Sequence, residues 1–214
     1  MTDQTPPDVS GFMPPRQKRS EATLARIFDG AMSLLATREL SSISMEEIAG
    51  AAGVSVGAIY RRFKSRQTLL DELLRGLQAR QLAVLEEALS PDLWRGVGLE
   101  ARLDWIVARQ AEAAARAPGF IRAVFGRVTG SVGALDDEAV RLNTLAVEQL
   151  AQWLLQCEGE IRTPNPEATA RVAVAQLSIS LHLAALYPAT FAPAALEDVS
   201  PILKAIALKA LTTE

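Results

Sequence analysis

The sequence AAGVSVGAIYRRFKSR, residues 51–66, places a glycine turn directly before a segment rich in cationic and aromatic side chains. Gly53 suits a left-handed turn, because a residue without a Cβ atom takes a positive φ at little cost. Ser55 is a favourable N-cap for a helix that runs to Phe63. Ile59 and Phe63 are four residues apart and form its inward-facing stripe, so the polar residues lie on its outer face.

A second short helix precedes this turn. Ser44 and Glu47 form the capping box S-x-x-E, in which each side chain satisfies a backbone amide of the other residue, and the helix ends before Gly53. Small Ala49 lies where the two short helices cross. Two short helices joined by a tight glycine turn form a helix-turn-helix, whose second helix fits the major groove of B-DNA. On spacing alone, an ordinary helical hairpin with solvated charges explains the pattern equally well.

The remaining sequence predicts further helices. Apolar residues recur at helical spacing, and segments rich in Gly or Pro interrupt them. Ser65 and Asn165 are predicted N-caps, and Asn165 is followed by Pro166 at the first helical position. The alternation typical of strands is missing between these segments, which favours an all-α fold. The predicted helices span residues 20–37, 65–89, 99–116, 119–128, 135–157, 166–187 and 195–211.

Charge is distributed unevenly along the 214 residues. The net charge of −3 by itself argues against a nucleic-acid partner. Residues 14–68, however, carry nine Lys or Arg and five Asp or Glu, whereas residues 69–214 have a net charge of −5. A basic N-terminal module on an acidic body attracts phosphates at one end only. Arg16, Lys18 and Arg19 extend this module, either as a basic arm or as part of a solvated tail.

Several function classes have little support in the composition. Cys157 is the single cysteine and His182 the single histidine, and neither a disulfide nor a metal site can be built from one of each. The sequence has no G-x-S-x-G, phosphate-binding glycine loop or H-E-x-x-H, so we expect no enzyme, cofactor or metal site. Residues 1–15 hold four prolines and are predicted to be a disordered tail without a signal peptide. We find no apolar run of the roughly 18–20 residues that a membrane helix needs and expect a soluble, cytoplasmic protein without membrane contact.

The segment SMEEIAGAAGVSVGAIYRRFKSR resembles the N-terminal DNA-binding domain of the TetR family of bacterial transcriptional regulators. The resemblance covers about Lys18 to Leu77 and rests on the ordered pieces EEIA, AGVS, a glycine two positions after that serine, and Y-x-x-F. It implies an all-helical dimer with a three-helix DNA-binding domain at residues 16–77, its helix-turn-helix at 44–63, and a larger ligand-binding and dimerisation domain at 78–214.

The resemblance also implies which residues touch DNA. Helix-start groups, tyrosine and cationic side chains would hold backbone phosphates, and the outer face of the recognition helix would meet base edges. The implied phosphate contacts are Ser44, Ser55, Tyr60, Arg62 and Arg66. Lys64, at the end of the outer face of the same helix, is placed to reach a phosphate as well. The implied base contacts are Val56, Gly57, Ala58 and Arg61.

The chain departs from the family pattern at several positions. The family often has Lys or Arg where Val56 stands, histidine where Arg62 stands and lysine where Arg66 stands. These departures change affinity and sequence preference more than the mode of binding. Glu39 replaces the glycine usual after the first helix, and Ile43 replaces the threonine usual before the second, so we expect a different turn between these helices.

The last two predicted helices, 166–187 and 195–211, are apolar on nearly every face and must therefore be buried. A chain of this size can bury one such helix in its own core, but two suggest a face shared with a second copy. In the TetR family the corresponding helices form a four-helix dimer bundle. A twofold dimer would place two recognition helices about 34–36 Å apart, on successive turns of a palindromic operator.

The resemblance implies that the middle helices enclose a small-molecule effector, as they do in members of the family. Their apolar and aromatic lining favours a hydrophobic compound, although most of these side chains are expected to be ordinary core. The candidate ligand contacts are Trp105, Phe120, Phe125, Trp153, Cys157 and His182. The resemblance thus implies a dimeric repressor that an inducer releases from its operator. The alternative is a helical small-molecule-binding or protein-interaction module that binds no operator.

Overall fold

The computed structural model describes residues 18–116, 118–128, 137–187 and 196–213. The regular elements in these ranges are helical, which confirms the predicted all-α fold. The tail predicted at residues 1–15 and Arg16 lie outside them, and Lys18 and Arg19 are the first residues of a helix rather than an arm before it. In chain order the elements are α1 (Lys18–Leu35), the 3₁₀ turn η1 (Leu40–Ser42), α2 (Met45–Ala52), α3 (Val56–Tyr60), α4 (Arg66–Ala88), the 3₁₀ turn η2 (Pro91–Trp94), α5 (Leu99–Arg116), α6 (Pro118–Val128), α7 (Asp137–Leu155), α8 (Pro166–Leu186) and α9 (Leu196–Thr212).

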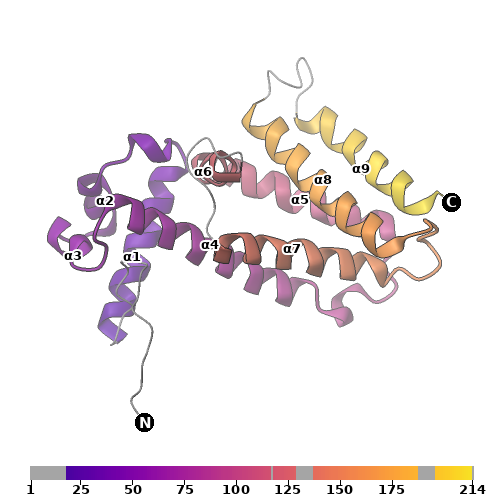
Figure 1. The fold of residues 1–214 in the computed structure, drawn as a ribbon, viewed down its shortest axis with the longest axis horizontal. Helices are drawn as coiled ribbons and strands as arrows, with labels where there is room; N and C mark the ends of the chain where they lie inside the picture. The colour runs from indigo at the N-terminus through magenta and orange to yellow at the C-terminus, as the bar shows by residue number, and fades with distance from the viewer. Residues whose placement is uncertain (1–17, 117, 129–136, 188–195, 214) are drawn as a thin grey trace, which may run out of the picture.

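Figure 1 shows two parts of the molecule along its longest axis. The helices α1, α2 and α3 lie at one end, and α5, α7, α8 and α9 form a bundle at the other. The long helix α4 passes from the first part into the second, and α6 lies where the two parts meet (Figure 1). The domain boundary expected between residues 77 and 78 therefore falls inside a continuous helix.

The N-terminal core confirms the predicted inward stripe of α3. Ile59 and Phe63 are both 0% exposed and pack with buried residues of α1, α2 and α4. Gly30, in the middle of α1, lies against the backbone of α2. A Cβ atom at Gly30 would lie 2.8 Å from the backbone nitrogen of Ala52 in α2, so the absence of a side chain lets these two helices pack closely.

Three predicted helix starts are confirmed. The Ser44 capping box is complete, with both of its hydrogen bonds formed. The Ser65 hydroxyl accepts a hydrogen bond from the N–H of Thr68 at 3.1 Å. The Asn165 side chain accepts one from the N–H of Ala168 at 3.3 Å. Each cap satisfies an amide that the first helical turn leaves free, which is why these starts can be read from the sequence.

The recognition helix is shorter than the predicted span of residues 55–63. α3 comprises Val56–Tyr60. The N–H groups of Arg62 and Phe63 both donate to the carbonyl oxygen of Ile59, at 2.8 and 3.0 Å. The chain therefore tightens into a turn after Tyr60, and that turn brings Phe63 into the core.

The helix α8 corrects the expectation that no segment reaches membrane length. It is long and apolar enough to be a candidate membrane span by length and composition. Residues 172–186 contain no Asp, Glu, Lys or Arg. Their single Gln and two serines are too few to lower the mean hydropathy of the helix below that of a candidate span. Val174, Leu177 and Leu181 nevertheless lie in the core of the C-terminal bundle, and the core helix of a soluble protein passes the same test.

Candidate nucleic-acid interface and effector region

The turn between α2 and α3 has the geometry that its sequence predicts. Gly53 takes φ 61° and ψ 39°, in the left-handed region, and its N–H points to the carbonyl groups of Ala49 and Gly50. The Ser55 hydroxyl accepts a hydrogen bond from the N–H of Ala58 at 3.2 Å and so caps α3. The helices α2 and α3 therefore form a helix-turn-helix.

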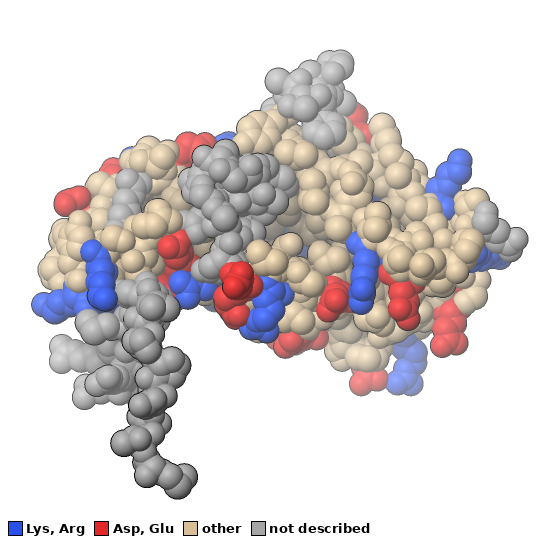
Figure 2. Space-filling model, in the orientation of Figure 1, with Lys and Arg blue, Asp and Glu red and all other residues tan. Residues whose placement is uncertain are grey.

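The outer surface of α3 exposes part of the predicted DNA-contact set. Tyr60 is 51% exposed, although it is a large aromatic side chain. A Cβ atom at Gly57 would meet no atom within 4 Å, so the backbone there is open to an approaching molecule. Arg61, directly after α3, and Lys64 are exposed as well. Figure 2 shows Lys and Arg atoms at the end of the molecule that α3 occupies in Figure 1.

Other residues of the predicted set are less accessible. Val56 and Ala58 are half-buried, and Val56 packs against the N-terminal core. Arg62 is half-buried in the turn that follows α3. Arg66 is the first residue of α4, and its side chain lies outside the described part of the structure. Of the four predicted base contacts, Gly57 and Arg61 are thus the more exposed.

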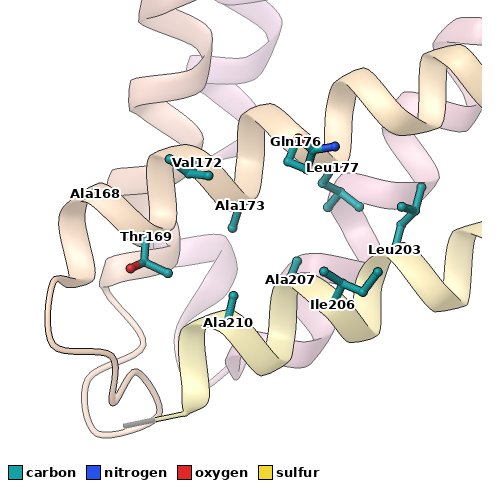
Figure 3. A pocket seen from close by; sticks show the side chains of 10 residues that line it. All are labelled: Ala168, Thr169, Val172, Ala173, Gln176, Leu177, Leu203, Ile206, Ala207 and Ala210. Carbon is teal, nitrogen blue, oxygen red and sulfur yellow. The ribbon is translucent and has the colours of Figure 1, made fainter.

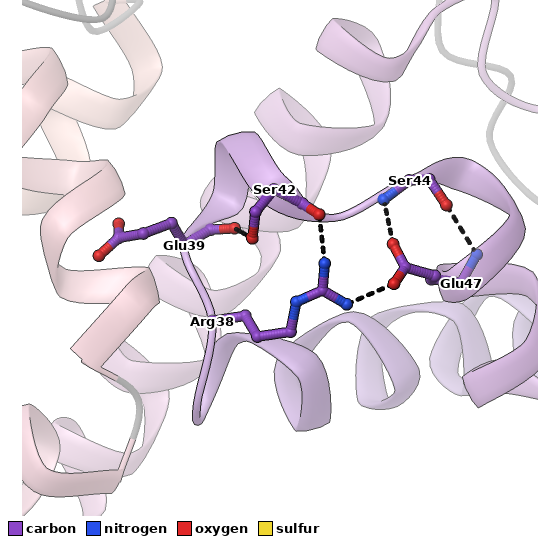
Figure 4. A network of polar contacts seen from close by, with 5 residues as sticks. All are labelled: Arg38, Glu39, Ser42, Ser44 and Glu47. Atoms are coloured by element: carbon purple, nitrogen blue, oxygen red, sulfur yellow. Dashed lines mark hydrogen bonds and ion pairs between the residues drawn. The ribbon is translucent and has the colours of Figure 1, made fainter.

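Ser44 begins α2 inside a network of polar contacts (Figure 4). Glu47 Oε2 accepts a hydrogen bond from the Ser44 N–H at 2.8 Å, and Ser44 Oγ accepts one from the Glu47 N–H at 3.1 Å. Arg38 forms an ion pair with Glu47 and donates to the carbonyl oxygen of Ser42. Hydrogen bonds from Arg38 and from the Ser44 backbone lower the pKa of Glu47 from 4.5 to about 2. The two amides are therefore occupied, and the Ser44 hydroxyl proton is the group that can still donate to a phosphate.

Two of the six candidate ligand contacts belong to a cluster of all three tryptophans. Trp94, Trp105 and Trp153 meet edge to face, with ring centroids 4.6, 5.4 and 5.6 Å apart. The guanidinium carbon of Arg102 lies 5.0 Å from the Trp153 ring centroid. Arg102 is 5% exposed and donates to the carbonyl oxygens of Trp94, Val97 and Trp153. Arg102 thus links the backbone of Trp94 to that of Trp153. Its charge can be buried because carbonyl oxygens accept its hydrogen bonds.

The other four candidates have different surroundings. Cys157 is buried in the same core as Trp153, and its burial raises the pKa of the thiol. Phe120, by contrast, lies in the N-terminal core and not among the tryptophans. Burial lowers the pKa of His182 on α8 and so favours its neutral imidazole. The side chain of Phe125 lies outside the described residues.

A small polar cleft between α4 and α7 was not predicted from the sequence. Its volume is about 250 Å³. Gln149 Nε2 donates to Glu86 Oε1 at 2.9 Å, while Gln149 Oε1 and Trp153 Nε1 are buried and meet no partner within the described structure. A buried acceptor and donor of this kind suit a bound water or a small polar group. The lining residues are Glu86, Leu89, Gln149, Gln152, Trp153 and Gln156.

A wider apolar groove runs between α8 and α9. Its volume is about 440 Å³. Figure 3 shows Val172 and Ala173 of α8 on one side of the groove, with Ile206 and Ala207 of α9 on the other. Val172 is 67% exposed and Ile206 58% exposed. The described chain therefore leaves Val172 and Ile206 of this groove largely uncovered, while Leu177 beside them is buried.

The described residues offer binding surfaces and no evident reaction centre. Among the residues that the structure describes, no group of three His, Cys, Asp or Glu side chains is placed to hold a metal ion. Cys157 follows α7 and His182 lies on α8, in separate surroundings. The described surfaces offer cations and an open helix face at one end and apolar side chains at the other.

Comparison with known families identifies both parts of the chain. Residues 27–73 match the bacterial regulatory proteins of the TetR family, and this range contains α2, the Gly53 turn and α3. Residues 98–205, half of the chain, match the tetracyclin repressor-like C-terminal domain. The chain belongs to the TetR family. This confirms the resemblance first seen in residues 44–66, and the family is one of transcriptional regulators rather than enzymes.

Individual TetR-family proteins resemble the chain to different extents. The HTH-type transcriptional repressor KstR2 of Rhodococcus jostii (strain RHA1) is 35% identical over 72 residues, which cover 34% of this chain and 33% of that protein. The chain therefore matches about a third of the length of this curated relative.

Solved structures of the family share the whole fold. A tetR-family transcriptional regulator from Streptomyces coelicolor has a TM-score of 0.67 at 21% identity, with 90% of this chain and 82% of that chain covered. Thermus thermophilus FadR, a TetR-family transcriptional repressor solved in complex with lauroyl-CoA, has a TM-score of 0.61 at 22% identity, with 89% and 96% covered. At these identities the likeness concerns the fold.

Proposed function

We propose that this TetR-family chain is a cytoplasmic, ligand-responsive repressor that binds a palindromic operator as a homodimer. The observation that carries the proposal is the exposed outer surface of α3, held after a left-handed glycine turn. Tyr60 and the open backbone of Gly57 lie on this surface, and Arg61 and Lys64 follow it in the turn after α3. An α-helix fits the major groove, and arginine can pair with the O6 and N7 atoms of guanine.

The contacts divide into two roles. Arg61 and the open backbone at Gly57 would meet base edges, which specify sequence. Tyr60, Lys64, Arg62 and Arg66, together with the hydroxyl groups of Ser44 and Ser55, would hold phosphates and fix the register. Val56 and Ala58 would offer base edges only the part of each side chain that the core leaves exposed.

The groove between α8 and α9 supports the dimer. Ile179 on α8 and Ile202 on α9 are 44% and 60% exposed, in addition to Val172 and Ile206 on the same two helices. A second copy with the same two helices would cover these side chains in a twofold arrangement, because such an interface is self-complementary. The twofold axis would also explain a palindromic operator.

The effector proposed for the C-terminal helices is a hydrophobic small molecule. To release the operator it must bind the form with low DNA affinity more tightly, and such couplings are typically about 1–3 kcal/mol. Lauroyl-CoA, the ligand of the Thermus thermophilus relative, is a suitable probe. All three tryptophans form one cluster, so their fluorescence should respond to lauroyl-CoA and not to coenzyme A. An equal response to both compounds would argue against an acyl-chain site.

Selection of bound duplexes from a random DNA pool tests the function. We expect the wild-type protein to enrich an inverted repeat at moderate salt. A helical module without operator binding, the alternative function, would enrich no sequence while still binding a ligand. The two functions are therefore separated by one experiment with the intact chain.

A further inference from the structure

The polar cleft between α4 and α7 lies at the end of the bundle that is farther from the helix-turn-helix (Figure 1). Glu86 stands in the last turn of α4, and Gln149 and Trp153 stand in the last two turns of α7. Glu86, Gln152 and Gln156 are exposed at this cleft. The cleft therefore opens on the surface of the bundle, while Trp153 connects it with the core.

Gln149 and Trp153 bring one hydrogen-bond acceptor and one donor to this cleft. They are four residues apart on α7 and therefore project from the same face of the helix. Trp153 is 1% exposed, yet its Nε1–H meets no acceptor among the described residues. Gln149 Oε1 is buried too and accepts no hydrogen bond from them. Since buried polar groups without partners destabilise a fold, an occupant that pairs with both atoms would be bound favourably.

Glu86 fixes the orientation of the Gln149 amide. Gln149 Nε2 donates a hydrogen bond to Glu86 Oε1 at 2.9 Å. An ionised carboxylate only accepts hydrogen bonds, so the amide of Gln149 cannot exchange its nitrogen and oxygen without losing this contact. Glu86 also places a negative charge at the edge of the cleft. The site thus combines a donor, an acceptor and a carboxylate.

A neutral carboxamide matches this combination of groups. Its carbonyl oxygen can accept a hydrogen bond from Trp153 Nε1, and its amino group can donate to Gln149 Oε1 and to the Glu86 carboxylate. A carboxylate ligand has no proton to donate to Gln149, and Glu86 would repel it. An ammonium ligand cannot accept a hydrogen bond from Trp153. The cleft therefore favours a neutral amide over either charged group.

The size and lining of the cleft limit the ligand further. Its volume of about 250 Å³ is below the roughly 300–1,000 Å³ of typical sites for drug-sized ligands, so a single ring or the end group of a longer compound fits. Leu89 and the Trp153 ring supply apolar surface. Gln152 and Gln156 are long, exposed side chains at the edge, and their rotation can open a path to the buried atoms.

We propose that this cleft binds the neutral carboxamide group of a small molecule, through Trp153 Nε1, Gln149 Oε1 and the Glu86 carboxylate. The assignment of this amide to the effector rests on the proposed function, whereas the hydrogen bonds themselves do not depend on DNA binding. A mainly hydrophobic effector would then carry an amide at the cleft and its apolar part beside the tryptophan cluster.

NMR titration of the isotope-labelled full chain with benzamide tests the site. The three tryptophans of the chain give three indole N–H signals, and Trp153→Phe identifies that of Trp153. If this variant does not fold, Trp94→Phe and Trp105→Phe identify it by elimination. Benzamide should move the Trp153 signal to lower field, because the N–H gains an acceptor. Benzoate, which has the same ring and no N–H group, should not.

An equal shift with benzamide and benzoate would overturn the amide site. The absence of a shift with benzamide would overturn it as well and would leave water as the occupant. A shift of the Trp105 signal without one of the Trp153 signal would also overturn it, because the ligand would then lie elsewhere in the tryptophan cluster.

A variant of the acceptor provides a second test. Gln149→Met nearly keeps the length of the side chain but removes its polar atoms, so it should weaken benzamide binding about two- to tenfold, the range for one hydrogen bond. Gln81→Met is the matched control, because Gln81 is exposed on α4 and does not line the cleft; it should bind benzamide as wild type does. Equal Kd values for Gln149→Met and wild type would overturn the assigned acceptor.

Failure of this site and failure of the proposed function have different signatures. Duplex selection decides the function without benzamide, and the indole signal decides the site without DNA. For the effector role, saturating benzamide should lower the affinity of wild type for its selected duplex, and the same concentration should lower that of Gln149→Met less. Unchanged affinity of wild type, or an equal change in both proteins, would overturn the role of the cleft in regulation.

Discussion

Gly57 is the residue at which DNA binding and folding can be separated most cleanly. A Cβ atom added at Gly57 would meet no atom of the protein within 4 Å. Gly57→Ala should therefore leave the free energy of unfolding unchanged or raise it by up to about 1 kcal/mol, because alanine has a higher helix propensity than glycine. If a base edge or the DNA backbone lies against this position, the methyl group should lower operator affinity by about 1–3 kcal/mol, the usual cost of overpacking. Denaturant unfolding and competition binding measure the two effects.

Gly50 in α2 provides the control for this experiment. It is also exposed, and a Cβ atom there would likewise meet no atom within 4 Å. Gly50→Ala should therefore match Gly57→Ala in stability but keep wild-type affinity for the operator. Equal affinity of both variants and wild type would show that DNA does not approach Gly57.

Glu47 gives the start of α2 a pH dependence. The ion pair with Arg38 and the hydrogen bonds around Ser44 hold the pKa of Glu47 at about 2 instead of 4.5. A lowered pKa in the folded chain means that the carboxylate stabilises the fold above about pH 4.5, and that this contribution is lost as the pH falls from 4.5 toward 2. Glu47→Gln should therefore be less stable than wild type at pH 7, and the difference should narrow below pH 4.5.

Denaturant unfolding of both proteins at several pH values measures this difference. Glu46, the preceding residue, is exposed and supplies the matched variant Glu46→Gln, which should track wild type more closely. A difference between Glu47→Gln and wild type that stays constant from pH 7 to pH 3 would contradict the assigned ion pair.

At the level of helices, local signals in the sequence predicted where helices begin better than which helices contact one another. Ser44, Ser65 and Asn165 cap their helices as expected, because a cap depends on residues only three positions apart. The early end of α3 could not be read from its periodicity, since packing of Phe63 in the core decides it. Gly119 was likewise readable only as a break, because its neighbours are carbonyl groups far away in the sequence, those of Leu35 in α1 and of Arg38 after it.

The candidate sites follow the same division. The helix-turn-helix is contiguous in sequence, so its turn, caps and inward stripe were predictable. The surroundings of the candidate effector contacts depend on long-range packing. Aromatic character alone could not separate Phe120 in the N-terminal core from Trp105 and Trp153 in the bundle. Little in the sequence indicated that Gln149 and Trp153 line one polar cleft. The signal was their spacing of four residues, which places them on the same face of α7.

The helices α8 and α9 are expected to hold two copies together. Val172→Glu would place a charge in the groove between them and should convert the dimer to a monomer, because burying an unpaired charge is costly. Val84→Glu is the control, since Val84 is 60% exposed on α4, compared with 67% for Val172. Light scattering after size-exclusion chromatography measures the mass of each variant.

The mass measurement, together with flotation on lipid vesicles, distinguishes a second copy of the chain from a membrane as the occupant of the groove. A monomeric wild type would contradict the dimer. Co-flotation of wild type, but not of Val172→Glu, with lipid vesicles would instead assign the apolar face of α8 to a membrane. A dimer that survives Val172→Glu would place the interface elsewhere on the molecule.

Across the whole molecule, charge and symmetry favour the same function. The net charge of −3 conceals a basic N-terminal segment and an acidic remainder. In a twofold dimer joined through α8 and α9, both recognition helices would face the duplex while the acidic bodies repel its phosphates. Operator affinity should therefore fall steeply with salt, as it does when several phosphates are neutralised.

The base preference of Arg61→Ala tests the central claim most directly. Selection from a random duplex pool should show that Arg61→Ala loses preference at one base position in each half-site, at a cost of about 1–3 kcal/mol. Lys64→Ala, as a phosphate-contact control, should weaken all sequences about equally. The account is contradicted if Arg61→Ala selects the same motif as wild type with the same strength, or if wild type selects no motif.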